Sequence, residues 1–113
     1  MGNVLHVQQG DWQAIQSAAK PAFVDFWAEW CAPCRMLSPT FERLAETYGN
    51  AITFAKVDVD ELPELADKYA IRSIPTLLLL REGNVVERLV GLRSQQELER
   101  LLDQYAGVST NQQ

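Results

Sequence analysis

A strand-like run in this chain leads directly into two closely spaced cysteines. Residues 22–28 are apolar, aromatic and β-branched, apart from Asp25. Such a run is typical of a strand that is covered on both faces of a sheet. Cys31 and Cys34 follow it and are the only two cysteines of the chain. We therefore expect a buried strand whose end carries a pair of thiols.

The rest of the chain alternates between strand-like and helical patterns. The expected strands cover residues 4–7, 22–28, 52–58, 76–80 and 85–90, and the expected helices cover residues 12–19, 34–48, 61–69 and 95–106. The early strand–helix–strand units imply parallel strands, and the last two strands are typical of an antiparallel hairpin. The order predicts an α/β fold with one mixed five-stranded sheet and helices on both faces.

Two helix starts carry capping residues. Asp11 is expected to cap the first helix through its carboxylate. Ser94 and Glu97 form a capping box at the start of the last helix. In that arrangement the Ser94 hydroxyl accepts from the backbone N–H of Glu97, and the Glu97 side chain reaches back to the N–H of Ser94.

Size and charge limit the possible partners. With 113 residues the chain is one small domain, which we place at residues 1–107, followed by a short polar tail at residues 108–113. The net charge is −5, and no basic cluster is available to neutralise phosphates, so we expect no nucleic-acid binding.

The cytoplasm is the expected compartment. Residues 1–6 show neither the charged nor the apolar part of a secretory signal, and the apolar run Leu77–Leu80 is too short to cross a bilayer. We therefore expect no membrane association. In the cytoplasm a lone C-x-x-C pair is more often catalytic or metal-binding than a structural disulfide.

The spacing of Cys31 and Cys34 suits reversible dithiol chemistry. On a helix the two residues share one face, with Cα atoms ~5–6 Å apart, which a disulfide can bridge. Cys31 is expected at the helix start, where free N–H groups and the helix dipole stabilise a thiolate. Cys34, one turn deeper, is expected to be more shielded. This division suits an attacking and a resolving thiol.

Two other interpretations of the cysteine pair are a zinc half-site and two inert buried thiols. Tetrahedral zinc needs further ligands, and the only other soft donor is His6. The position of the pair beside a strand–helix unit favours redox chemistry.

Three segments resemble the thioredoxin family. Residues 24–34, which end in Trp-Cys-Ala-Pro-Cys, resemble its active-site segment. Residues 72–76, Arg-Ser-Ile-Pro-Thr, resemble its cis-proline loop, and Val90-Gly91 matches a third segment. The spacing agrees from about Val4 to Ala106. The resemblance implies the thioredoxin fold.

The resemblance also implies a role for Asp25. If this carboxyl is buried, desolvation raises its pKa, and it can then take a proton from Cys34 and return it. The alternative is an aspartate that faces solvent. Lys56 on the neighbouring strand corresponds to the family's usual ionic neighbour of this acid, and the alternative there is a solvated lysine.

A substrate surface is implied around Cys31. The resemblance makes the Ile74–Pro75 peptide bond cis and leaves the Ile74 backbone free to pair with an extended substrate. The expected substrate-binding residues are Trp30, Ala32, Pro33, Ser73, Ile74, Pro75, Val90 and Gly91, with Leu92 beside them. Each of them alone is also compatible with ordinary core packing, but together they fit a docking surface.

Three residues depart from the commonest family pattern. Ala32 replaces a glycine between the cysteines, Arg35 replaces a lysine after Cys34, and Ser73 replaces a glycine before Ile74. All three lie where a partner approaches, so redox potential and partner choice are the properties that they affect.

The resemblance implies a protein dithiol–disulfide oxidoreductase. It implies a protein without bound cofactor, which serves electron transport and cell redox homeostasis. We expect no bound metal, and nothing in the sequence demands more than a monomer. A thioredoxin reductase would re-reduce it with electrons from NADPH or ferredoxin, and its substrates would be disulfide-containing proteins. Two alternatives remain: a thiol oxidant or isomerase on the same fold, and a non-enzymatic binding subunit.

Overall fold

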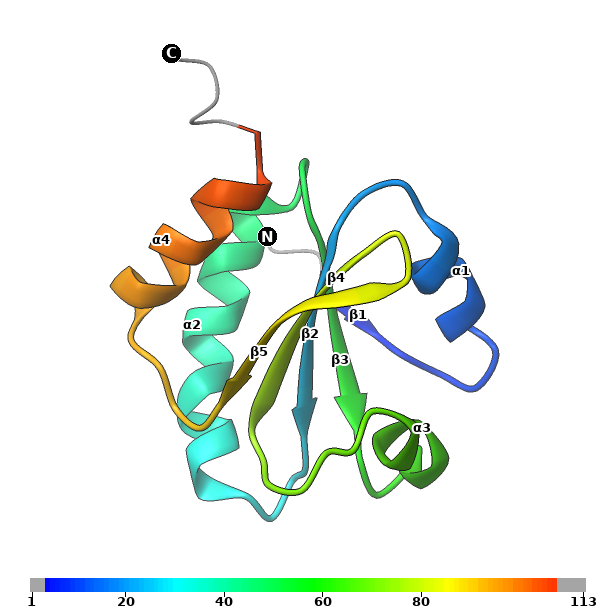
Figure 1. The fold of residues 1–113 in the computed structure, drawn as a ribbon. Coiled ribbons are helices and arrows are strands. Elements are labelled where there is room, and N and C mark those ends of the chain that lie inside the picture. Colours follow the sequence, from blue (N-terminus) through cyan, green and yellow to red (C-terminus); the bar gives the residue numbers. More distant parts are fainter. Residues whose placement is uncertain (1–3, 108–113) are drawn as a thin grey trace.

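The computed structural model describes residues 4–107, so the tail predicted at residues 108–113 lies outside the described residues. The elements, in chain order, are β1 (Val4–His6), α1 (Trp12–Ser17), β2 (Ala22–Trp27), α2 (Ala32–Tyr48), β3 (Thr53–Asp58), α3 (Pro63–Lys68), β4 (Thr76–Arg81), β5 (Asn84–Val90) and α4 (Gln95–Tyr105) (Figure 1). Every expected element is present, and its ends lie within two residues of the predicted ones. No helix in this part of the chain is long and apolar enough to cross a membrane.

The five strands form one mixed sheet in the order β1-β3-β2-β4-β5. β3 pairs in parallel with β1 and β2, whereas β4 runs antiparallel to both β2 and β5. The predicted fold class is confirmed. β2 lies in the middle of the sheet, so the continuous apolar run of residues 22–27 is buried on both faces, apart from a half-buried Trp27.

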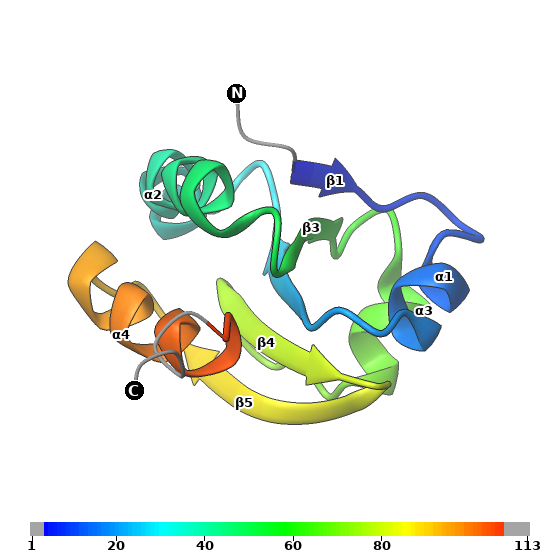
Figure 2. The same cartoon turned by 90° about the horizontal axis from the view of Figure 1, so that it is seen from above.

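Helices cover both faces of the sheet. α2 and α4 lie on one side and α1 and α3 on the other (Figure 2). Because side chains alternate along a strand, β2 sends Phe23 to the core beneath α2 and α4, and Val24 and Phe26 to the opposite core. Asp25 is two residues from Phe23, so it faces α2.

Helix α2 begins at Ala32, two residues earlier than predicted. Cys31 has an extended backbone, with φ −91° and ψ 108°, and serves as the N-cap residue. Its Sγ accepts from the backbone N–H of Cys34 at 3.2 Å. Pro33 fits the first turn, because the N–H that proline lacks would have no helical partner there.

The two predicted capping residues behave differently. Asp11 makes no side-chain cap, because its carboxylate accepts from the N–H of Gln8 at 2.8 Å. Ser94 caps α4 as predicted, accepting from the N–H of Glu97 at 3.1 Å. The predicted contact from the Glu97 side chain back to the N–H of Ser94 is wrong, because the Glu97 carboxylate pairs with Arg93 at 2.8 Å.

Ala70 ends α3 in the left-handed region, with φ 56°. Its N–H donates to the carbonyl of Asp67 at 3.0 Å, and the N–H of Ile71 donates to the carbonyl of Ala66 at 3.0 Å. This turn closes the helix and directs the chain toward Pro75. A side chain with a Cβ atom is strained in this conformation, whereas glycine is not.

We therefore predict that Ala70→Gly increases the free energy of unfolding by about 1 kcal/mol, because it relieves the left-handed strain. Urea unfolding measures the change. The control is Ala14→Gly, at an exposed position inside α1, which should decrease stability by about 1 kcal/mol. A loss of stability in both variants would contradict the prediction.

Candidate active site

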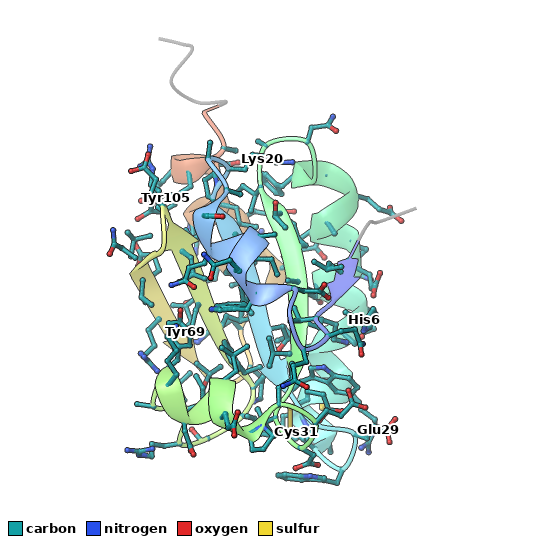
Figure 3. The ribbon with its side chains drawn as sticks, turned by 90° about the vertical axis from the view of Figure 1, so that its right-hand side faces the viewer. His6, Lys20, Glu29, Cys31, Tyr69 and Tyr105 are labelled. Atoms are coloured by element: carbon teal, nitrogen blue, oxygen red, sulfur yellow. A yellow bond between two sulfur atoms is a disulfide. The ribbon has the colours of Figure 1, made fainter. Side chains whose placement is uncertain are left out.

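The candidate site lies at the end of β2, where the chain enters α2. Cys31 and Cys34 form a disulfide, with their Cα atoms 5.3 Å apart. Figure 3 shows Cys31 near one end of the molecule, while Lys20 and Tyr105 lie near the other. Both cysteines are buried, and they pack with Ala28 against the half-buried Ile74.

The start of α2 surrounds Cys31 with backbone donors. The N–H of Cys34 points at its sulfur, 3.2 Å away, and the N–H of Arg35 donates to its carbonyl at 3.1 Å. A negative charge on a sulfur at this position is stabilised by the N–H group and by the dipole of a 17-residue helix.

The loop before β4 lies against the cysteines. The carbonyl oxygen of Ile74 is 3.7 Å from Sγ of Cys31, and the Ile74–Pro75 peptide bond is cis. The carbonyl of Pro75 accepts from the N–H of Gly91 at 2.8 Å, which ties the end of β5 to this loop. Gly91 has φ 95°, a conformation that glycine adopts without strain.

The predicted substrate-binding residues mostly face solvent. Trp30 is 67% exposed and Val90 is 48% exposed, and Leu92, their predicted neighbour, is 46% exposed. Ala32, Pro33 and Ser73 are also exposed, Ile74 and Gly91 are half-buried, and Pro75 is buried. The hydrogen bond from Gly91 to Pro75 joins the β5 part of this set to the part beside Cys31.

Asp25 is fully buried in the middle of β2. Neither of its carboxylate oxygens has a hydrogen-bond partner among residues 4–107. Burial disfavours the charged form and raises the pKa of Asp25 to about 7, although the positive charge of Lys56 opposes the shift. A carboxyl with this pKa changes its protonation state near neutral pH.

Lys56 lies beside Asp25 in the register of β2 and β3 and is only 6% exposed. Its ammonium group donates to the hydroxyl of Ser38 at 3.2 Å and lies 4.4 Å from the centre of the Trp27 ring. A cavity of about 360 Å³, lined also by His6 and Trp27, opens onto Lys56 from the β1 side. Lys56 thus lines this cavity and is also the register partner of Asp25, which does not line it.

Two contacts at the site were missed by the sequence analysis. The indole N–H of Trp30 donates to the carboxylate of Asp60 at 2.8 Å, and the guanidinium of Arg35 donates to the carbonyl of Glu29 at 2.6 Å. Together they hold the loop between β2 and α2 from two sides. Asp60 follows β3, which is remote in sequence, and no local pattern connects it to Trp30.

Comparison with known proteins agrees with this geometry. The thioredoxin family model matches residues 3–104. A thioredoxin of Alicyclobacillus acidocaldarius is 48% identical over 87 residues, covering 77% of this chain and 82% of its own. A thioredoxin of Bacillus subtilis is 46% identical over 81 residues, covering 72% and 78%. The chain belongs to the thioredoxin family.

Solved structures of thioredoxins share the fold of this chain. A mutant thioredoxin from Halobacterium salinarum superposes with a TM-score of 0.85 at 40% identity, covering 92% of this chain and 91% of the other. The thioredoxin of Malassezia sympodialis gives a TM-score of 0.86 at 32% identity, covering 94% and 93%.

Family membership and the close cysteine pair make the chain a protein dithiol–disulfide oxidoreductase, as predicted. Thioredoxins bind no cofactor of their own, so the dithiol itself carries the electrons. The disulfide takes up both sulfurs, and residues 4–107 contain no group of three or more His, Cys, Asp or Glu side chains that could hold a metal.

The raised pKa of Asp25 predicts a pH-dependent stability. In the unfolded chain the Asp25 carboxyl loses its proton near pH 3.8, whereas in the folded protein it keeps the proton up to about pH 7. The free energy of unfolding therefore falls as the pH rises between these values. Asp25→Asn removes the buried charge. At about 1.4 kcal/mol per pH unit, it should stabilise the oxidised protein by up to about 4 kcal/mol above pH 7 and hardly at all below pH 3.8.

Denaturant unfolding at several pH values measures this difference. The exposed Asp67→Asn variant is the control and should show no comparable rise with pH. If Asp25→Asn changed stability equally at low and high pH, Asp25 would not carry the raised pKa.

Proposed function

We propose that Cys31 is the nucleophile and Cys34 the resolving thiol in the reduction of protein disulfides. The Cys31 thiolate attacks one sulfur of the substrate disulfide, forms a mixed disulfide and expels the other sulfur as a thiolate, which takes up a proton. Cys34 then loses its proton, attacks Sγ of Cys31 and expels the second substrate thiol. The substrate gains two electrons, and the Cys31–Cys34 disulfide is formed.

The position of Cys31 at the N-cap of α2 is the observation that carries this assignment. The N–H of Cys34 points at the sulfur of Cys31, so the helix start favours a thiolate on Cys31 rather than on Cys34. Cys34 lies inside the first turn, is 1% exposed and reaches the substrate only after Cys31 has captured it.

Asp25 is proposed to move the proton of Cys34. The buried face of α2, which begins with Cys34 and continues through Leu37 and Phe41, packs on the sheet face that carries Asp25. With a pKa of about 7, the carboxyl is matched to accept a proton at neutral pH and to return it. Lys56 modulates this role, because its charge stabilises the ionised carboxyl.

The substrate is proposed to bind as an extended chain beside Ile74. Backbone hydrogen bonds to this segment would give affinity for many sequences, since they do not depend on side chains. The exposed apolar rim of Trp30, Val90 and Leu92 would bury apolar substrate residues next to the disulfide.

Partners and location are inferred from family membership and charge. A thioredoxin reductase, supplied with electrons by NADPH or ferredoxin, would regenerate the dithiol. We propose that the protein works as a monomer in the cytoplasm, where it serves electron transport and redox homeostasis. The net charge of −5 supports a role without nucleic acid.

Insulin reduction with dithiothreitol tests the assignment. The native protein should accelerate precipitation of the reduced insulin chains, whereas Cys31→Ser should not exceed the uncatalysed rate. Cys34→Ser is the matched control: it retains the nucleophile, and when it is reduced, freed of dithiothreitol and then mixed with insulin, it should form a stable mixed disulfide that mass spectrometry detects. Native rates for Cys31→Ser would overturn the assignment.

A further inference from the structure

A groove of about 400 Å³ lies beside the loop that carries Pro75. Apolar side chains dominate its lining, among them Trp30, Val59, Ile71 and Ile74. The polar residues of the lining are Arg72 and Ser73, and Arg72 brings the only charge. The groove is continuous with the proposed substrate surface, because Trp30 and Ile74 belong to both.

Arg72 is exposed and makes no hydrogen bond or ion pair within residues 4–107. Other arginines near the site are engaged: Arg35 donates to the carbonyl of Glu29, Arg88 to the carbonyl of Tyr69, and Arg93 pairs with Glu97. The guanidinium of Arg72 is therefore free to bind a group that the protein itself does not supply. A carboxylate matches its forked donors.

The position of Arg72 fixes where such a carboxylate would lie. The carbonyl of Ile74 is 3.7 Å from Sγ of Cys31, and Arg72 precedes Ile74 by two residues. Residues 73–75 form a bend, and two residues of chain span at most about 7 Å, so the backbone of Arg72 lies within that distance of Ile74. A substrate strand that pairs with Ile74 while its cysteine contacts Cys31 thus brings residues within two positions of that cysteine to Arg72.

The positive charge of Arg72 differs in sign from the net charge of the protein. With a net charge of −5, the protein repels acidic substrates at long range. Asp60, which holds the indole of Trp30 at 2.8 Å, adds a negative charge on the Trp30 side of the groove. An acidic substrate residue is therefore attracted on the Arg72 side of the groove and repelled on the Trp30 side. The charges thus orient the substrate as well as select it.

We propose that Arg72 selects disulfide substrates in which an acidic residue lies within two positions of the reactive cysteine. This inference rests on the proposed function. It adds a charge preference to a binding mode that otherwise depends on the backbone and on apolar contacts.

Three disulfide-linked peptide dimers test the proposal. They are identical except for Glu, Gln or Lys placed two residues from the cysteine. Pre-reduced protein is mixed with each dimer, samples are quenched with acid, and chromatography gives the second-order rate constant of reduction. The native protein should reduce the Glu peptide about two- to fivefold faster than the Lys peptide, as expected for an exposed ion pair. Added salt should diminish this ratio.

Variants separate the local effect from net charge. Arg72→Gln should abolish the preference and Arg72→Glu should invert it. Arg100→Glu makes the same charge change at an exposed arginine on α4 and should preserve the native ratio. Equal ratios in the native protein, Arg72→Glu and Arg100→Glu would overturn the proposal while leaving the proposed function intact. If the native protein reduced none of the peptides, both the charge preference of Arg72 and the proposed function would be wrong.

Discussion

The desolvation of one carboxyl group is the constraint on which the site depends. Asp25 occupies the central strand of the sheet, between β3 and β4, and is completely buried. Without a hydrogen-bond donor among residues 4–107, its ionised form is held only by the charge of Lys56. The pKa therefore rises into the neutral range. The ionised carboxylate lowers the stability of the folded protein at high pH. In return, the protein contains a buried group beneath α2 that can exchange a proton near neutral pH.

The second element of the site is the start of α2, which makes the two thiols unequal. Cys31 caps the helix and accepts the N–H of Cys34, while Cys34 lies inside the first turn. The sheet aligns both features, because β2 carries Asp25 and leads directly into the cysteine loop. β4 runs antiparallel beside β2, so the loop with Ile74 starts at the same end and meets Cys31.

Local sequence patterns predicted the elements and the pairing of Cys31 with Cys34, since apolar periodicity and the cysteine spacing reflect physics within a few residues. The start of α2 was misplaced because the cap is a cysteine side chain, a residue type that propensities do not associate with capping. The Glu97 contact was wrong because a nearby guanidinium competes with the backbone N–H. Contacts between distant segments, such as Trp30 with Asp60 or the groove beside Arg72, have no local signal and required the structure.

Asp25 is proposed to take the proton of Cys34 when the mixed disulfide is resolved. The most direct measurement mixes reduced protein with a small aromatic disulfide and follows release of its two thiols separately, for the native protein and Asp25→Asn. The first thiol reports the attack by Cys31 and should appear at the same rate in both. The second reports the attack by Cys34 and should appear about a hundredfold more slowly in the variant at neutral pH. Equal rates of release of the second thiol from the native protein and Asp25→Asn would show that Asp25 does not take this proton.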